Sequence, residues 1–506
     1  MMDHIMNTRL SLAFGESYAR IPLQKSPHIH NVDALEIDWN SVLPAETCAY
    51  VFGNPPFVGA KYQSETQRAQ VRRIAALGGA GGTLDYVAAW FLQAGAYVGD
   101  RPIRIGFVAT NSLTQGEQVG QFWPIVFDKF HLELAFAHRT FAWGSDAPGM
   151  AHVHVVIIGL APRGREPAEK RLFSYADIKG EPSCSRHAAL SPYLIDASSL
   201  TDRHLVVRKV SKPLSGAPRL ISGTQPIDDG SYIFNEEERA DFLRQEPEAD
   251  AFLHPFIGTD EFLYDIKRWI LNLESATPNQ LARMPHIKTR MRAVRQYRHK
   301  SKRNSTLEIA DYPERYNVCV IPDRPFLVIP EVSSERRDYI PIGWLQPPVI
   351  PSNLVRVMLD ATLWHFGILT SAMHMAWTRQ IGGRLKSDYR YSIGLVYNTF
   401  PWPEAKAAER RRIEALAQAV LEARAKFPGA TLAALYDPDL MKPALRRAHA
   451  ALDRAVDRLY RPAPFASERE RVEHLFALYE RQSAPALAAM QPAPKPTPKR
   501  RKPRPV

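Results

Sequence analysis

The first third of the chain alternates between short apolar runs and longer stretches with helical spacing. The runs HIHNVDAL, CAYVF, IRIGFVAT, LELAFAH and HVHVVIIGL have the length and composition of strands. Between the second and third runs, TLDYVAAWFLQAGAYV repeats its apolar positions at the period of a helix. Strands that alternate with helices predict an α/β domain with a mostly parallel sheet, which we assign to residues 1–165.

The remaining chain divides into four further segments that differ in composition and in the spacing of their apolar residues. Residues 166–214 begin with a polar, proline-rich stretch and are a predicted connector. Residues 215–403 combine frequent prolines, short apolar runs and basic residues between aromatics, which indicates a separate α+β domain. Residues 404–484 are rich in Ala, Glu and Arg at helical spacing and predict a small helical region. Residues 485–506 form a Pro/Ala/Lys tail that we expect to be disordered.

Composition and charge narrow the function classes. At 506 residues, 45% hydrophobic and 23% charged, the chain has the makeup of an ordinary multidomain globular protein. Its apolar runs are too short to cross a bilayer, and its first residues lack the pattern of a signal peptide. The three cysteines are far apart and form no metal or disulfide pattern, so we expect no metal and a cytoplasmic location. The net charge of +12 favours a polyanionic partner.

The stretch CAYVFGNPPFVGAKYQ places a rigid corner directly after an apolar run. Proline fixes its own φ and keeps the preceding residue extended, so Asn54, Pro55 and Pro56 have little freedom where a strand ends. The Asn54 side chain and the Pro55 carbonyl are acceptors, and Phe57 adds an apolar face. This set suits an aromatic amine, whose two hydrogens can be held while its ring is stacked. A simple turn followed by a core phenylalanine explains the tetrapeptide alone equally well.

The wider sequence resembles a known family. NPPF after an apolar strand resembles the catalytic motif of γ-class adenine-N6 DNA methyltransferases. Several stretches, in the same order along most of the chain, resemble the methylase module of type IIG/IIL restriction–modification enzymes. The matching stretches are KSPHIHNVDALEIDW, GNPPFVGAKYQSETQRAQV, GGTLDYVAAWF, GFVATNSLTQGEQV, AHRTFAWGSDAPGMAHVHVVIIG and GGRLKSDYRYSIGLVYNTFPWP. The resemblance implies a Rossmann-like class I methyltransferase sheet, a DNA target-recognition domain at 215–403, and S-adenosyl-L-methionine as the methyl donor for a flipped adenine.

The resemblance also implies roles for individual residues. Asn54, Pro55, Pro56 and Phe57 would form the catalytic corner, with Phe57 stacked on the base. Phe141 would be a second stacking residue, although Trp143 competes for this role. Asp33 would contact the adenine amino group of the cofactor. We expect Asp85 to cap the helix that it precedes, and Asn111, Ser112 and Gln115 to shape the base pocket.

Part of the family pattern is missing from the sequence. The glycine-rich cofactor loop, and the acidic residue that holds the cofactor ribose, have no counterpart before Asp33. Without the strand that precedes that loop, CAYVF would have an unpaired edge, and such an edge is sticky or is completed by another chain. We therefore expect an N-terminally truncated or split methylase that needs a separate polypeptide for the missing half. The alternative is a catalytically silent DNA-binding or specificity subunit.

Two basic stretches are candidate contacts to double-stranded DNA. Residues 283–303 contain no acid, and a stripe of basic residues recurs there at near-helical spacing, with Arg290, Tyr297 and Arg298 off the stripe. A solvated basic helix face is the ordinary explanation of such a run. In the second stretch, residues 380–392, Gly382 and Gly383 would let the backbone approach a groove or phosphate. The predicted DNA-binding residues are Lys288, Arg290, Arg292, Arg295, Arg298, Lys302, Arg384, Lys386 and Arg390, and the tail adds Lys499, Arg500, Arg501 and Lys502.

Overall fold

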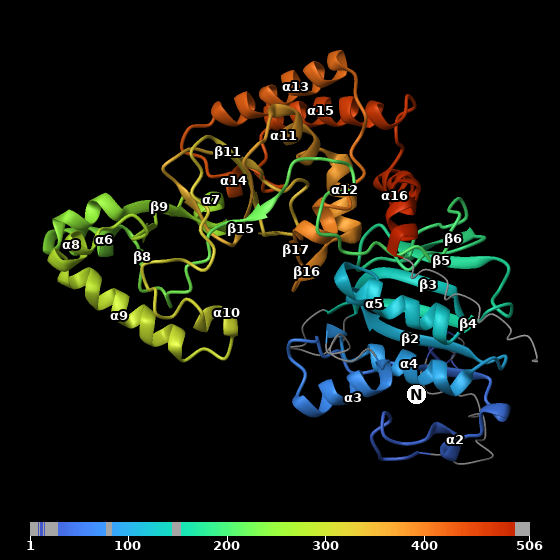
Figure 1. Cartoon of the computed structure of the whole chain (residues 1–506). Helices are drawn as coiled ribbons and strands as arrows, with labels where there is room; N and C mark the ends of the chain where they lie inside the picture. The colour runs from blue at the N-terminus through green and yellow to red at the C-terminus, as the bar shows by residue number, and fades with distance from the viewer. Residues whose placement is uncertain are drawn as a thin grey trace, which may run out of the picture.

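A computed structural model of the chain describes residues 29–76, 83–143 and 153–490, together with a few isolated positions before residue 16. Three parts are visible in Figure 1: an α/β part at the lower right, a lobed central part, and C-terminal helices across the top. This arrangement confirms the predicted fold class. None of the described helices is both long and apolar enough to pass through a membrane.

A six-stranded sheet organises the α/β part. Its strands are β1 (Tyr50–Gly53), β2 (Arg104–Thr110), β3 (Leu132–Trp143), β4 (Val153–Pro162), β5 (Lys170–Tyr175) and β6 (Pro182–His187), in the order β1-β2-β4-β3-β5-β6. Only β1–β2 and β3–β5 are parallel neighbours, because β4 returns between β2 and β3 in the opposite direction. The prediction of a mostly parallel sheet was therefore wrong, although β1, β2 and β3 all end at the same edge.

Helices cover one face of this sheet. α3 (Glu65–Ala75), α4 (Ala88–Val98) and α5 (Val119–Pro124) follow β1 and β2 in the chain, and α4 and α5 lie in front of the strands in Figure 1. Phe91 of α4 packs edge-on against Phe107 of β2 and Phe122 of α5. These contacts bury that face and turn the C-terminal ends of the strands toward the rest of the molecule.

Two predicted boundaries differ from the structure. The run HIHNVDAL is not a strand where it is described, since the Asp33 carboxylate accepts the Leu35 N–H (2.9 Å) and closes a turn. Strands β5 and β6 lie within the predicted connector 166–214 and continue the sheet to His187. Neither strand had a strong alternating pattern, and both are held in place by pairing with β3 and with each other.

The central part contains three small sheets. β14 (Ile350–Pro351), β9 (Leu253–Ile257), β10 (Trp269–Leu271) and β8 (Ile233–Phe234) form the first. β13 (Gly343–Leu345), β11 (Phe326–Pro330), β15 (Val355–Met358) and β7 (Ile221–Ser222) form the second, and β12 (Val332–Ser333), β17 (Asp388–Arg390) and β16 (Gly383–Leu385) the third. Residues 232–316, here called the recognition lobe, have a separate hydrophobic core. The lobe also contains α6 (Glu236–Gln245), α8 (Pro278–Arg283), α9 (Pro285–His299) and α10 (Asn304–Leu307).

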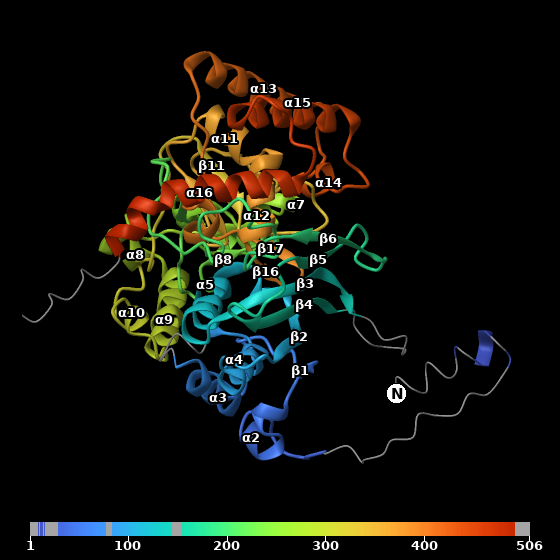
Figure 2. The ribbon, with the colours of Figure 1, turned by 90° about the vertical axis from the view of Figure 1, so that its right-hand side faces the viewer.

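The C-terminal helices pack on the central part. α13 (Ala407–Ala425) and α15 (Pro443–Tyr460) lie beside α11 (Leu363–Leu369) and α12 (Ala372–Ile381), with the short α14 (Leu432–Leu435) between them in the chain. Figures 1 and 2 show α16 (Glu468–Met490) running above β5 and β6. Because α16 continues to Met490, residues 485–490 of the predicted tail are helical, and the rest of that segment lies outside the described residues. The basic residues Lys499, Arg500, Arg501 and Lys502 lie outside the described residues.

Candidate functional site

The rigid corner lies where β1 ends at the edge of the sheet. Gly53 is the last β1 residue and pairs with Phe107 of β2, so the segment that follows runs beside the end of β2. Asn54 is exposed, Pro55 is buried and Phe57 is partly buried against the main core. Among the described residues the Asn54 amide has no hydrogen-bond partner. The corner is thus anchored by Pro55 while both the acceptor and part of the aromatic ring remain open to a ligand.

Asp85 ties the corner to the end of β2. Its Oδ1 accepts from the Ala60 N–H (2.9 Å) and from Gln118 Nε2 (3.0 Å). Its Oδ2 accepts from Thr110 Oγ1 (3.2 Å) and from the Ser112 hydroxyl. The expected helix cap was therefore wrong, because this carboxylate links three segments rather than the N–H groups of α4. Removing it would free both loops beside the corner.

A second network positions Asp33. Its Oδ2 accepts from Gln70 Nε2 (2.8 Å), and the same nitrogen contacts Glu36 Oε1 (2.7 Å). The Gln70 oxygen accepts from the Tyr86 hydroxyl (2.6 Å), which fixes the orientation of the buried amide. Asp33 itself is exposed. An oriented, exposed carboxylate can accept a hydrogen bond from an amino group, as the predicted cofactor contact requires.

Phe141 belongs to an aromatic cluster on β3 and β5. It stacks on Tyr175 with ring centroids 4.9 Å apart, and His138 stacks on Phe173 at 4.2 Å. The Tyr175 hydroxyl lies 2.9 Å from His138 Nδ1. Burial lowers the pKa of His138, so this ring is neutral near pH 7. Phe141 also contacts His138 and Trp143, and Trp143 at the end of the strand is more exposed, so both candidates for base stacking remain.

The strand register brings these groups to one edge. Thr110 at the end of β2 and Phe141 near the end of β3 both pair with Val155 of β4. With strands spaced about 4.8 Å apart, the backbones of Thr110 and Phe141 are about 10 Å from each other. Asn54 follows β1 on the other side of β2. The corner, the Asp85 network and the aromatic cluster therefore share one side of the sheet within about three strand spacings.

The loop after β2 contacts the hairpin β16–β17. A Cβ built on Gly116 would lie 3.1 Å from the Gly383 Cα, so the two backbones meet with no room for a side chain. Arg384 Nε donates to Gln115 Oε1 (3.4 Å), and its guanidinium lies 4.1 Å from the Tyr389 ring centroid. These contacts hold the hairpin against the candidate base pocket, and the predicted phosphate contacts of Gly383 and Arg384 stay a prediction.

The helix α9 divides its basic residues between two faces. Lys288, Arg292 and Arg295 are exposed on the outer face, as the spacing predicted. Arg298 is 0% exposed, and its guanidinium donates to five backbone carbonyls. Arg290 lies 4.1 Å from the Phe234 ring centroid. The DNA-contact prediction was wrong for Arg298, whose donors are all used inside the lobe, and Arg290 is turned toward the lobe core.

The remaining predicted contacts differ in how free they are. Arg295 forms an ion pair with Asp311, which lowers the pKa of that carboxyl, and Arg390 pairs with Glu331 (3.2 Å). Lys302 and Lys386 are exposed and have no side-chain partner among the described residues. Lys386 adopts a φ of 58° at the hairpin turn and so projects from the tip. Free cations are the groups that can exchange water for phosphate without losing a partner.

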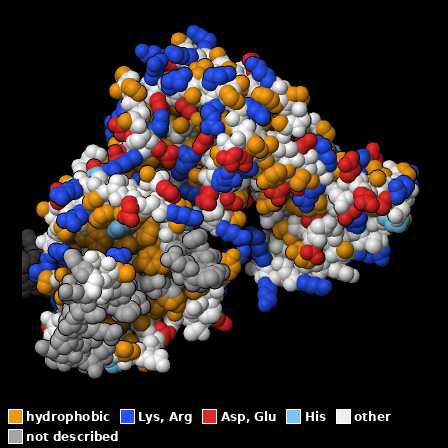
Figure 3. All heavy atoms as spheres, turned by 180° about the vertical axis from the view of Figure 1, so that it is seen from behind, with side chains coloured by type: hydrophobic (Ala, Val, Ile, Leu, Met, Phe, Trp, Pro, Cys, Tyr) orange, Lys and Arg blue, Asp and Glu red, His pale blue; other side chains and the backbone are white. Residues whose placement is uncertain are grey.

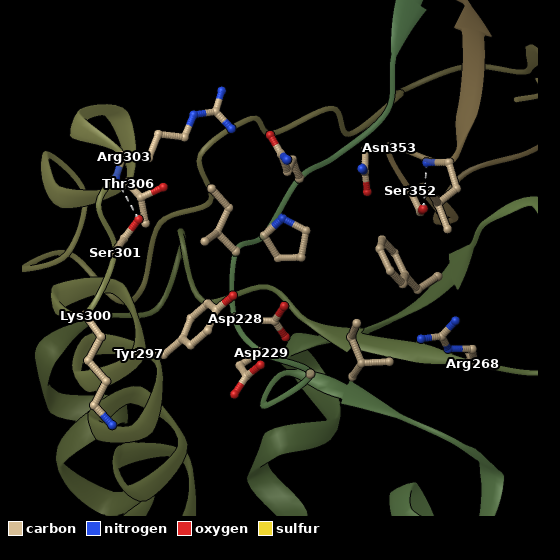
Figure 4. A pocket seen from close by; sticks show the side chains of 17 residues that line it. Asp228, Asp229, Arg268, Tyr297, Lys300, Ser301, Arg303, Thr306, Ser352 and Asn353 are labelled. Atoms are coloured by element: carbon tan, nitrogen blue, oxygen red, sulfur yellow. Dashed lines mark hydrogen bonds between the residues drawn. The ribbon is translucent and has the colours of Figure 1, made fainter. Parts of the chain in front are cut away.

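A cavity of about 680 Å³ separates the α9–α10 segment from the strand ends of the central part. Figure 4 shows Tyr297, Lys300 and Arg303 on one wall, with Asn353 on the opposite wall. Between them the chain segment with Asp228 and Asp229 forms the floor. Basic, aromatic and amide side chains around one polar cavity are the types that contact phosphates and base edges. The sequence analysis missed this set, because its members come from four segments far apart in the chain.

The surface connects the two regions. Figure 3 shows a notch between the α/β part and the recognition lobe, bordered by Lys and Arg side chains, and hydrophobic side chains gathered on the α/β part. The exposed basic residues of the lobe include Lys300, Lys302 and Arg303. A notch bordered by Lys and Arg side chains suits an elongated polyanion.

Three domain families match the chain, in an order that parallels these parts. They are described as "MmeI, DNA-methyltransferase domain" for residues 1–174, "MmeI, target recognition domain" for 201–404 and "MmeI, C-terminal domain" for 405–487. Together they account for nearly the whole described chain, and the hairpin β16–β17 falls in the second match.

Two relatives extend the match across the domains. "DNA methyltransferase A" of Bacillus subtilis (strain 168) is 36% identical over 481 residues, which are 94% of this chain but 53% of that protein. The solved structure of the type IIL restriction–modification enzyme MmeI in complex with DNA has 40% identity and a TM-score of 0.82. The match covers 95% of this chain and 63% of the MmeI chain in that structure. The chain thus spans about half to two thirds of the length of these relatives.

Proposed function

Because the chain belongs to the MmeI family, we propose that it is the DNA-methylating and target-recognising part of a restriction–modification enzyme. The observation that carries the proposal is the exposed corner Asn54–Phe57, which follows β1 at the edge of the sheet. The solved MmeI relative is a complex with DNA, which supports DNA as the partner. Adenine at its exocyclic amino group is the proposed target, because the corner has the Asn-Pro-Pro-Phe sequence.

The corner acts by preorganisation. Asn54 Oδ1 and the Pro55 carbonyl accept the two amino hydrogens of a flipped adenine, so electron density stays on the nitrogen and its lone pair points outward. Phe57 packs on one face of the base, and the Asp85 network keeps the corner from relaxing. Once methylated, the nitrogen is a cation and releases one proton to water. These residues therefore need no general base before the transfer.

The methyl donor is proposed to be S-adenosyl-L-methionine, which supplies an electrophilic methyl group when bound. The oriented Asp33 carboxylate fits a contact to the amino group of its adenine. Among the described residues no strand precedes β1, so the residues in hand fit only one end of such a cofactor. The other contacts to the cofactor must come from groups other than these residues.

The free edge of β1 supports a partner-dependent activity. Among the described residues β1 pairs only with β2, and Tyr50 and Phe52 on this strand are 65% and 81% exposed. On the Phe52 face, Phe136 lies across Gly106 and Gly159, and it is only partly buried. We infer that a strand from a separate polypeptide pairs with β1 and brings the remaining cofactor contacts. Mixing the chain with the preceding methyltransferase segment of a relative should give a complex that methylates DNA.

The Asn54→Ala variant tests the enzymatic proposal in any preparation that methylates DNA. Loss of one preorganised acceptor should lower the methylation rate by about 10²-fold or more, while DNA affinity stays within about twofold. Asn279→Ala is the matched control, because Asn279 is an exposed asparagine of the lobe without a side-chain hydrogen bond. Product analysis should find N6-methyladenine. N4-methylcytosine instead, or full activity of Asn54→Ala, would contradict the assignment.

The second candidate function is a catalytically silent DNA-binding or specificity subunit. The observation that favours it is the separate core of the recognition lobe, which lets DNA binding proceed whether or not the sheet is completed. The two functions separate in one experiment. A wild-type chain that binds DNA but never methylates it, even with the completing segment bound, is the specificity subunit.

A further inference from the structure

A second, smaller cavity lies at the same edge of the sheet as the corner. Its volume is about 220 Å³, room for about seven water molecules at 30 Å³ each. It is enclosed by the loop after β2, the strands β3, β4 and β5, the segment after β6 and the end of α12. The lining residues are Thr114, Gln115, Arg139, Thr140, Val156, Ser174, Tyr175, Tyr193, Leu194 and Gln380. The lining contains no carboxylate.

A β-bulge turns two of these residues into the cavity. In the β3–β4 pairing, His138 lies opposite Ile157 and Phe141 opposite Val155, so Arg139 and Thr140 together face the single residue Val156. The extra residue re-aims the side chains of the strand, a device common beside active sites. Arg139 and Thr140 line the cavity as a result, and Phe141 follows directly on the strand.

The charge of Arg139 is not matched by a partner. Its only hydrogen bond in the described structure is a long one, from Nη2 to Gln380 Oε1 (3.5 Å), and no described carboxylate lies within ion-pair distance. Burial lowers the pKa of Arg139, and the nearby Arg469 acts in the same direction, while Glu468 and Glu473 partly oppose them. The closest acids, Glu468 and Glu473, already pair with arginines of α12 and α16.

Three other enclosed arginines of the chain are compensated, whereas Arg337, which is 7% exposed, donates only to Ser333 Oγ (3.3 Å) among the described residues. Arg356 pairs with Glu331 (2.8 Å), Arg471 pairs with Asp457 (2.7 Å), and Arg298 satisfies five carbonyls. A guanidinium withdrawn from water without such partners costs folding free energy. Because Arg139 also lines a cavity without carboxylates, its guanidinium is placed to bind an external anion.

Further donors surround the same cavity. The Ser174 hydroxyl is buried and has no hydrogen-bond partner. Gln115 uses its oxygen to accept from Arg384 (3.4 Å), which leaves its NH₂ group available, and the Thr140 hydroxyl has no described partner. One guanidinium with two hydroxyls and an amide is a donor set for a tetrahedral oxyanion.

We propose that Arg139, with Thr140, Ser174 and Gln115, binds a backbone phosphate of the DNA strand that carries the flipped base. This inference rests on the proposed function, and it adds a DNA contact inside the methyltransferase part. Phe141 lies two positions after Arg139, a reach of about 7 Å along the strand. A phosphate held there would fix the sugar–phosphate backbone next to the stacked base, while the recognition lobe holds the duplex.

The salt dependence of DNA binding tests the contact in the full chain. Removing one phosphate contact should reduce the magnitude of the slope of log K against log salt by about 0.9 and weaken binding several-fold at low salt. We expect this for Arg139→Gln, and a slope near that of the wild type for Arg139→Lys. Arg171→Gln is the control, because Arg171 is an exposed arginine of β5 without a side-chain partner and should leave the slope unchanged.

Thermal unfolding without DNA separates a binding role from a structural one. If Arg139 serves a ligand, Arg139→Gln should unfold at the same temperature as the wild type or a higher one, since an unpaired charge is removed. A clear loss of thermal stability in this variant would overturn the proposal and assign Arg139 to the fold.

The source of the oxyanion is resolved with inorganic phosphate. At constant ionic strength, phosphate that stabilises the wild type but not Arg139→Gln, with no change in the DNA slope, would identify a free-anion site and overturn the DNA contact. An unchanged slope with no phosphate effect also overturns it. Both results leave the proposed function standing, whereas a wild-type chain that binds no DNA at all removes the proposed function itself.

Discussion

Aromatic residues are exposed at the free edge of the methyltransferase sheet but buried in the core of the recognition lobe. On β1, Tyr50 and Phe52 are largely exposed, although they belong to a strand. In the lobe, Tyr232 and Phe234 are 0% exposed and belong to a closed cluster. The lobe encloses these aromatics in its own cluster, whereas β1 presents aromatic surface that a further strand can cover. This contrast underlies the proposal that DNA recognition is autonomous while methyl transfer needs a completing strand.

A pair of phenylalanine variants measures this contrast directly. Phe234→Ala should lower the free energy of unfolding by about 3–5 kcal/mol, because it empties a fully buried site. Phe52→Ala should change it by no more than about 0.5 kcal/mol, because the ring already lies in water. Chemical denaturation of the isolated chain provides both values. A large loss at Phe52 would mean that the edge is covered within this chain and that no added strand is needed.

Arg298 tests whether the lobe core depends on one buried cation. Its five carbonyl partners would be left without donors in Arg298→Met, so we expect a loss of about 3–5 kcal/mol in unfolding free energy. Arg292→Met, on the exposed face of the same helix, is the control and should stay within about 0.5 kcal/mol. Equal effects of the two variants would contradict the assignment of inner and outer faces.

The C-terminal helices add a pH-dependent contribution to the central part. Asp453 of α15 accepts from the Tyr339 hydroxyl (2.6 Å) and the Ala372 N–H (2.7 Å), and burial raises its pKa to about 6. Its protonated form stabilises the fold fully below about pH 4, and this contribution is lost as pH rises through about 6. The expected loss is at most about 3 kcal/mol. Unfolding curves from pH 4 to 7 should show it in the wild type, and Asp453→Asn should flatten it.

The smallest expected effects concern the outer face of α9. Lys288→Gln and Arg292→Gln should each reduce the magnitude of the salt slope of DNA binding by about 0.9 and leave sequence preference unchanged, if each contacts one phosphate. Arg411→Gln on α13 serves as a control of equal charge change in the C-terminal helices. Slopes measured by fluorescence anisotropy that match the wild type would show that this face is only solvated.

Much of the architecture was readable from local patterns. The runs that became β1, β2, β3 and β4 and the helix α4 were predicted near their observed positions, because each is a continuous or periodic apolar stretch of the sequence. Strands β5 and β6 were missed, since their place depends on pairing with β3. The turn around Asp33 was mistaken for a strand, because an Asp side chain can close a turn within an otherwise apolar run.

The residues of the candidate site also fall into those that local sequence predicted and those that it did not. The corner Asn54–Phe57 could be predicted from the sequence, because proline restricts the backbone of its immediate neighbours. The role of Asp85, the inward turn of Arg298 and the unpaired charge of Arg139 were not, since each depends on groups that are distant in the chain. Helical spacing placed Arg290 and Arg298 off the basic stripe, but it did not show what they would meet inside the lobe.

By itself the sequence determined the order of the parts, the stiff acceptor corner and the excess of basic charge, because these follow from neighbouring residues and composition. Only the tertiary structure decided which cations are free to meet an anion and which are used up inside the protein. The physical reason is that burial and hydrogen bonding set the value of a charge, and both are properties of the packed chain.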